Sequence, residues 1–224
     1  YIQTGRYLQR MLPDLGVRFI AICDGYDSER TEFMEEALLL PVMNLMNDAY
    51  CRDISRKVRC QQAAKRRQGD YVGAFAVYGY RKAEQDHNKL VRDEPAAQVV
   101  EKIFYWRKKG NSAEKICGFL NSLLIPSPYC YKKMNHSNYT SGFAGEDTGL
   151  WSPVAVRRIL KNEMYTGVMI QGKDRKISYK VKRRVRISRE DWICVPGAVP
   201  VIVEPELFQE VQTIKSRRGR KKSI

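Results

Sequence analysis

The sequence predicts an α+β fold, in which a long helix leads into a mixed domain of short helices and antiparallel strands. Three observations support this class. A stretch with helical spacing covers about 41–67, shorter amphipathic segments follow it, and residues 176–187 alternate between apolar and cationic side chains. Hydrophobic residues make up 43% of the 224, so the chain can bury a core and is not a disordered tail.

The charge is strongly positive and unevenly distributed. The net charge is +15, with −4 in residues 1–50, +7 in 51–92, +1 in 93–149 and +11 in 150–224. Two basic blocks around a nearly neutral middle favour a long polyanionic partner, either nucleic acid or an anionic membrane surface. No apolar run approaches the roughly 20 residues that span a bilayer, and no signal peptide opens the chain. The cytosol is therefore the expected compartment.

The six cysteines include no C-x-x-C pair, and the chain has two histidines. This composition predicts no structural zinc site and no disulfide framework. The thiols are expected to be reduced and mostly to serve as packing groups.

The N-terminal segment predicts a small helix–strand unit. Residues 1–15 have helical apolar spacing, the segment from Pro13 to Gly16 breaks the helix, and residues 17–23 are typical of a short buried strand. Such a unit is too small to fold alone and belongs at the edge of something larger.

The long helix is expected to begin at about Pro41, which suits a first-turn position, and to end before Gly69. In its second half, arginines share one third of the circumference without a compensating acid; they are Arg52, Arg56, Arg59, Arg66 and Arg67. We interpret this stripe as a phosphate-facing helix end. An ordinary solvated face is the alternative.

Residues 69–80 contain several Gly and aromatic residues, and their apolar residues have no helical spacing, which indicates an extended linker. Its aromatic side chains, among them Tyr78 and Tyr80, could lie along a DNA groove or pin the loop to the core. The two interpretations are compatible.

Two amphipathic helices are expected next. Asp93 is predicted to cap the first, which runs to about Lys109, and Ser112 the second, which runs to about Leu123. Their inward residues are expected to be Val99, Val100, Ile103, Phe104, Ile116, Phe119, Leu120 and Leu123. Residues 129–149 are rich in Tyr, Ser, Asn and Gly and are predicted to form a long loop.

A third short helix is predicted to begin with Ser152 as its N-cap and Pro153 as its first residue. Its apolar face would hold Val156, Ile159 and Leu160, and its opposite face Arg157, Arg158, Lys161 and Asn162. A short helix with one apolar face to pack on the domain, and long polar side chains on the opposite face, suits the major groove of DNA. A basic surface helix is the alternative, and the long loop before it departs from the short turn of a helix-turn-helix.

Residues 176–187 predict one strand with an apolar face and a cationic face. The cationic face holds Lys176, Ser178, Lys180, Lys182, Arg184 and Arg186. Since no amphipathic helix with a bulky aromatic face accompanies it, nucleic acid is preferred over a membrane as the opposing anion. Residues 165–171 are the expected partner strand, 192–195 a third strand, 205–216 a closing helix, and 217–222 a basic tail.

Seven stretches, taken in order, resemble the large serine recombinases, the resolvase- and invertase-type enzymes of mobile elements and phages of Gram-positive bacteria. They are YIQTGRYLQRMLPDLGVRFIAICDGYDS, DAYCRDISRKVR, GAFAVYGYRK, KLVRDEPAAQVVEKIF, FLNSLLIPSP, WSPVAVRRILKNEMYTG and VPVIVEPELFQEVQ. Each stretch alone is weak evidence for the family, but together the seven span almost the entire chain and are highly specific for it. Val77 departs from the family, which usually has Pro before Tyr-Gly-Tyr, so a less rigid linker is expected there.

The resemblance implies four parts: the end of the catalytic α/β domain at 1–30, a long connecting helix at 31–68, a recombinase (DNA-binding) domain at 69–217 and a basic tail at 218–224. In this family a serine attacks a phosphodiester and no metal is needed. That serine and its arginine cluster would precede Tyr1. We therefore assign no catalytic residue, no metal and no cofactor, and expect the chain alone not to cleave DNA.

The implied function is sequence-specific binding of duplex DNA attachment sites, as the targeting part of an enzyme that integrates or excises a mobile element. A homodimer or tetramer of the full-length protein would act on bacterial DNA in the cytoplasm. A free-standing transcription regulator with a modified helix-turn-helix is the alternative, and an RNA-binding protein is disfavoured because no aromatic RNP-type motif is present. The candidate DNA-contacting residues are Arg52, Arg56, Arg59, Arg66, Arg67, Tyr78, Tyr80, Ser152, Arg157, Arg158, Lys161, Lys176, Lys180, Lys182, Arg184 and Arg186.

Overall fold

The computed structural model describes residues 6–22, 26–29, 33–135 and 149–214. The chain divides into two compact units. The first contains Tyr1–Gln61 and Lys176–Arg183, and the second contains Gln62–Arg175 and Arg184–Ile224. The expected basic tail at 217–222 lies outside the described residues.

The N-terminal part of the first unit is built of short elements. They are the π-helical turn η1 (Tyr7–Met11), the helix α2 (Leu12–Asp14) and the paired strands β1 (Ile20–Ala21) and β2 (Tyr26–Asp27). Helix is thus confirmed over part of 1–15. The predicted buried strand is wrong, because only two residues pair and the Ile20 side chain is 53% exposed.

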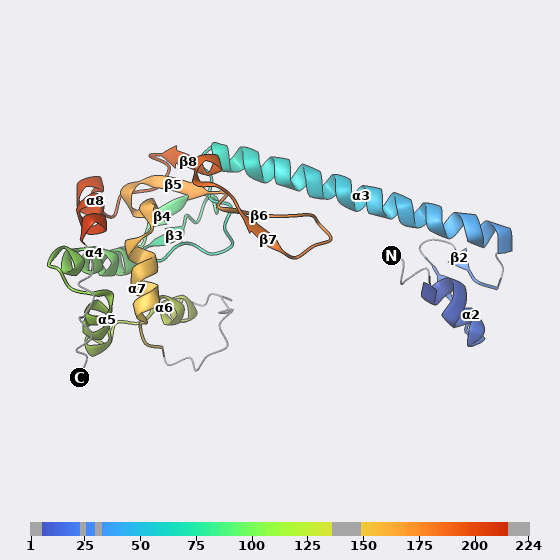
Figure 1. The fold of residues 1–224 in the computed structure, drawn as a ribbon, viewed down its shortest axis with the longest axis horizontal. Helices are drawn as coiled ribbons and strands as arrows, with labels where there is room; N and C mark the ends of the chain where they lie inside the picture. Colours follow the sequence, from blue (N-terminus) through green and yellow to red (C-terminus); the bar gives the residue numbers. More distant parts are fainter. Residues whose placement is uncertain (1–5, 23–25, 30–32, 136–148, 215–224) are drawn as a thin grey trace, which may run out of the picture. The chain divides into compact units, whose positions relative to one another are not determined.

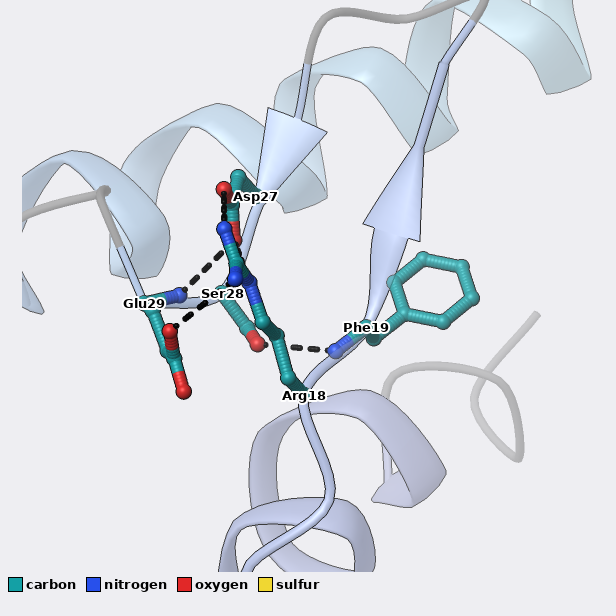
Figure 2. A network of polar contacts seen from close by, with 5 residues as sticks. All are labelled: Arg18, Phe19, Asp27, Ser28 and Glu29. Atoms are coloured by element: carbon teal, nitrogen blue, oxygen red, sulfur yellow. Dashed lines mark hydrogen bonds and ion pairs between the residues drawn. The ribbon is translucent and has the colours of Figure 1, made fainter.

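A polar network ties the two short strands together (Figure 2). The Arg18 guanidinium donates to both carboxylate oxygens of Asp27 at 2.9 and 2.6 Å and lies 3.3 Å from a carboxylate oxygen of Glu29. The Phe19 N–H donates to the Ser28 hydroxyl at 2.9 Å. Hydrogen bonds, rather than a buried apolar layer, thus hold this hairpin.

The long helix α3 spans Phe33–Arg67 and therefore begins well before Pro41, contrary to the start predicted from helical spacing. The segment before the proline is rich in Met, Glu, Ala and Leu, which are strong helix formers, and their propensity carries the helix through Pro41. The predicted end is confirmed. Gly69 adopts φ +83°, and the N–H groups of Gly69 and Asp70 donate to Arg66 O and Lys65 O, a Schellman turn.

The second unit combines helices with short antiparallel strand pairs, which confirms the mixed helical and antiparallel class. Its helices are α4 (Glu94–Lys108), α5 (Ala113–Ser122), α6 (Pro128–Met134), α7 (Pro153–Leu160) and α8 (Pro205–Thr213), with the 3₁₀ turns η2 (Glu163–Thr166) and η3 (Arg189–Asp191). Its strands are β3 (Tyr80–Lys82), paired with β4 (Leu90–Arg92), and β5 (Val168–Gln171), paired with β8 (Ile193–Pro196). The strands β6 (Asp174–Lys176) and β7 (Arg184–Arg186) pair with each other.

Helix α4 lies at the centre of the hydrophobic core, with contacts to α5, α7 and α8 (Figure 1). Val100, Ile103 and Phe104 of α4 are fully buried, as are Ile116 and Leu120 of α5. Phe119 and Leu123, which were expected to point inward, are 40% and 58% exposed. Phe119 still packs edge-on against Trp106 of α4, with 5.6 Å between ring centroids, so it lies at the margin of the core, whereas Leu123 follows the end of α5.

Two helix starts differ in chemistry although both lie where predicted. The Ser112 hydroxyl accepts a hydrogen bond from the Lys115 N–H, as an N-cap does. Asp93 occupies the N-cap position of α4, but its carboxylate instead accepts from the Tyr131 hydroxyl at 3.0 Å. Tyr131 belongs to α6, a helix at 128–134 where a loop was predicted. Ser127 caps α6, and Pro128 occupies its first turn.

The predicted single strand at 176–187 is wrong. The chain reverses between β6 and β7, so the segment forms a hairpin, and β5 pairs with β8 instead of with it. The alternating apolar residues Ile177, Val181 and Val185 are 41–51% exposed. Every residue of β6 and β7 is exposed, so the alternation here does not mark a buried face.

Three of the cysteines that the structure describes, Cys51, Cys60 and Cys194, are exposed, so the expected packing role is wrong for them. Cys117 is buried, as expected.

Within the described ranges, no three His, Cys, Asp or Glu side chains come together as a metal site. Among the helices described, even the 35-residue α3 lacks an apolar stretch that could cross a bilayer.

Candidate nucleic-acid interface

The second unit carries a groove of about 810 Å³, which we call the cationic groove. Its positively charged lining residues are Arg66, Arg158, Lys161, Lys173 and Arg184. Asp174 also lines it and pairs with Arg184, with 3.1 Å between Nη1 and Oδ2. Five cations beside one carboxylate leave an excess of positive charge, which suits a polyanion.

Separate elements position these cations. Arg66 lies in the last turn of α3, directly before the Schellman turn. Arg158 belongs to α7, and Lys161 is the C-cap of that helix. Lys173 directly precedes β6, and Arg184 is the first residue of β7; the Ile187 N–H closes this hairpin by donating to Lys173 O at 3.0 Å. The groove therefore exists only when the end of α3, α7 and the hairpin are folded together.

One wall of the groove is the extended segment 71–77, held in place by the buried side chain of Gln171. The Gln171 amide nitrogen donates to Asp70 O at 2.6 Å, and its amide oxygen accepts from the Val72 N–H at 3.0 Å. This one side chain replaces the ladder hydrogen bonds that an extended segment would otherwise lack.

Replacing Gln171 with Leu is expected to lower the free energy of unfolding by about 1–3 kcal/mol, because it removes two hydrogen bonds and leaves partly buried backbone groups unpaired. Hydrogen exchange at the Val72 amide should accelerate. Urea unfolding and amide exchange measure the two effects. The exposed Gln98→Leu on α4 is the matched control, and equal stability of the two variants would show that Gln171 does not hold the segment.

Helix α7 confirms its predicted cap and apolar face. The Ser152 hydroxyl accepts from the Ala155 N–H at 3.2 Å, and Val156, Ile159 and Leu160 are buried. A capping hydroxyl is already engaged, so Ser152 is first of all a structural residue.

The four residues of the polar face of α7 do not share the same surroundings. Arg158 and Lys161 line the cationic groove, whereas Arg157 forms an ion pair with Glu114 of α5 beside a different hollow. The Asn162 amide oxygen accepts from the Met164 N–H at 3.3 Å and so caps η2. Three of the four predicted polar-face residues, Arg158, Lys161 and Asn162, therefore line the groove, and Arg157 does not.

In the first unit, the tip of the β6–β7 hairpin contacts α3. Lys180 Nζ lies 2.6 Å from a carboxylate oxygen of Asp48, and the Tyr179 hydroxyl donates to the same oxygen at 2.5 Å. Hydrogen bonds from Lys180 and Tyr179 hold the pKa of Asp48 below its usual value. A phosphate that binds Lys180 would have to compete with this carboxylate.

The predicted arginine stripe of α3 is split between the units. Arg52, Arg56 and Arg59 are exposed in the first unit, while Arg66 and Arg67 belong to the second. The expected absence of a compensating acid is wrong for Arg52, because its charge interacts with Asp48 one turn earlier. Lys176 and Lys182 are exposed in the first unit, and Arg186 is exposed in the second.

A protein-family model described as Recombinase matches residues 94–218, more than half of the chain. The chain belongs to the Recombinase family. This match confirms the family that the sequence resemblance indicates.

Solved structures give a more distant comparison with this Recombinase chain. One, described as "Sequence Requirements of the Listeria innocua prophage attP site", is 16% identical with a TM-score of 0.42, and the match covers 69% of this chain and 49% of that one. Another, described as "Crystal Structure of a LSR-DNA Complex", is 17% identical with a TM-score of 0.42 and coverages of 70% and 38%. The chain thus spans less than half the length of either. No match was found among the curated proteins.

The two predicted aromatic DNA contacts of this Recombinase chain are core residues. Tyr78 and Tyr80 are 7% and 4% exposed. The Tyr80 hydroxyl lies 3.1 Å from Met164 O and 2.9 Å from Pro200 O, and Tyr78 packs edge-on against Trp151. Of the two interpretations of the linker, the one in which its aromatics pin it to the core is correct here. Rings buried this deeply cannot reach a duplex, so the prediction of DNA contact is wrong for both.

Sequence reasoning missed Lys173, the fifth cation of the groove in this Recombinase, and Gln171, which holds the groove wall. Lys173 was one of many lysines in a basic block, and no local pattern set it apart. Gln171 stood at the end of a predicted strand, where an amide side chain gives no signal of its distant partners at 70 and 72. Only the tertiary structure brings these segments together.

Proposed function

We propose that this chain binds duplex DNA as the targeting part of a serine site-specific recombinase that integrates or excises a mobile element. The single observation that carries the proposal is the cationic groove, with five cations and one carboxylate in its lining. Membership of the Recombinase family supports the same conclusion. The partner would be DNA attachment sites, bound by a homodimer or tetramer of the full-length protein in the bacterial cytoplasm.

Within this proposal, α7 reads bases while Lys173 and Arg184, at the β6–β7 hairpin, hold phosphates. Arg158 and Lys161 extend from a short, capped helix, and such a helix can enter the major groove. Lys173 directly precedes the β6–β7 ribbon and Arg184 begins its second strand, and the repeated cations of this ribbon carry little sequence information. Arg157, paired with Glu114, is left out of the base-reading set that the sequence predicted.

The proposal is tested by titrating the full 224-residue chain against a labelled 30-base-pair duplex at several salt concentrations. If the five groove cations each contact one phosphate, the slope of log affinity against log salt is expected to be about −4.5, at roughly 0.9 per contact. Between 50 and 200 mM salt, the affinity should then fall roughly 500-fold.

A slope near zero would overturn the proposal, because a groove of this charge cannot hold a duplex without releasing counterions. A single strand and a duplex RNA of the same length serve as controls. Tighter binding of the RNA than of the DNA would contradict the choice of partner.

A further inference from the structure

A second hollow, of about 630 Å³, adjoins the cationic groove. Lys161 and Lys173 line both, so the two hollows meet at these lysines. The second hollow adds Arg189 and Trp192, together with Glu163 and Phe208. None of these four was among the candidate contacts that the sequence indicated.

The indole ring of Trp192 holds two of the cations. Lys173 Nζ lies 5.1 Å and Arg189 Cζ 5.8 Å from the ring centroid, distances at which a cation is attracted to the π-face. The ring is itself fixed, because its Nε1–H donates to Ile187 O at 3.1 Å. A fixed aromatic platform therefore restrains two long side chains that would otherwise move freely.

Arg189 is restrained from a second side. Its Nη2 lies 2.6 Å from a carboxylate oxygen of Glu163, yet its side chain is 71% exposed. A guanidinium has five N–H donors, so one carboxylate leaves others available to a further acceptor. A side chain that is both held and exposed loses little conformational entropy when it binds an anion.

The occupant that fits is a phosphodiester backbone. Three cations, Lys161, Lys173 and Arg189, line the hollow beside a single carboxylate, so its charge favours an anion. Because two of these cations also belong to the cationic groove, an anion that continues from one hollow to the next is favoured over a small one. Arginine and lysine are the usual partners of phosphate oxygens.

We propose that Arg189 contacts a DNA phosphate next to those held by the cationic groove, so that the interface continues past Lys173 to Trp192. This inference rests on the proposed function. Arg189 is a binding residue in it, and Trp192 and Glu163 are positioning residues that hold the cations.

The test measures binding of the full chain to a random-sequence 30-base-pair duplex between 50 and 200 mM salt. Arg189→Gln and Lys173→Ala are each expected to reduce the salt slope by about 0.9. For each, the ratio of wild-type to variant affinity should shrink about 3.5-fold across this range, and for the double variant about 12-fold. Arg189→Lys keeps the charge and should keep most of the slope.

Lys115→Ala, an exposed lysine of α5 that lines neither hollow, is the matched control and should keep the wild-type slope. Thermal unfolding shows which variants are folded, and Arg189→Ala replaces the glutamine variant if that variant does not fold. If Arg158→Ala and Lys173→Ala lower the slope while a folded Arg189 variant does not, this inference is wrong and the proposed function stands. If the wild type shows no salt-dependent binding, both are wrong.

Discussion

Replacing Arg66, Arg158, Lys161 and Arg184 together with alanine is expected to abolish most duplex binding. Counterion release lowers log affinity by roughly 0.9 per log unit of salt for each contact, so at 0.15 M each cation contributes about fivefold and four contribute several hundredfold. The salt slope should fall by about 3.6. Fluorescence anisotropy with a labelled duplex measures both quantities.

Arg157→Ala is the matched control for this experiment, because Arg157 neighbours Arg158 on the same exposed helix face but pairs with Glu114 outside the groove. Its loss should leave the slope unchanged, since an exposed ion pair contributes about 0–1 kcal/mol to stability. Equal loss of binding in Arg157→Ala and Arg158→Ala would show that the groove is not the binding surface.

The same pair of variants tests base reading by α7. On a site enriched from a random library, Arg158→Ala should cost about 1–3 kcal/mol more than on random duplex, the value of one bidentate arginine–base contact. Arg184→Ala should weaken binding to both duplexes equally. If Arg158→Ala also weakens both equally, α7 holds phosphates and does not read sequence.

Replacing Phe104 with alanine is expected to reduce the free energy of unfolding of the second unit by about 3–5 kcal/mol, the usual cost of a fully buried phenylalanine. Its ring packs against Tyr165 at 6.2 Å and Phe208 at 5.8 Å between centroids, and so links α4 with η2 and α8. The cavity left behind would open the centre of the core. Urea unfolding followed by circular dichroism measures the loss.

Two further variants provide reference values for the free energy of unfolding that Phe104→Ala loses. Phe119→Ala removes the same side chain from a position that is 40% exposed, and it should cost about 1 kcal/mol or less. Tyr165→Phe removes only the hydroxyl that donates to Tyr78 O at 2.8 Å, for about 1 kcal/mol. Similar losses for Phe104→Ala and Phe119→Ala would contradict the placement of the core at α4.

Local patterns in the sequence determined several elements of this protein. The Ser152 cap followed by Pro153 fixes the start of α7, Gly69 fixes the end of α3, and helical spacing places Val100 and Ile103 in the core. These features depend on residues within a turn or two of each other. Neighbours in the chain are enough to specify them.

Tertiary structure alone decided the rest. Alternation over 176–187 is the same for one strand and for two strands joined by a turn, and only the pairing of β6 with β7 distinguishes them. Arg157 and Arg158 are equivalent in sequence, but Glu114 on another helix pairs with one of them, while the other lines the groove. The groove itself joins side chains from residues 66 to 184, and contacts between such distant segments leave no periodic trace in a single sequence.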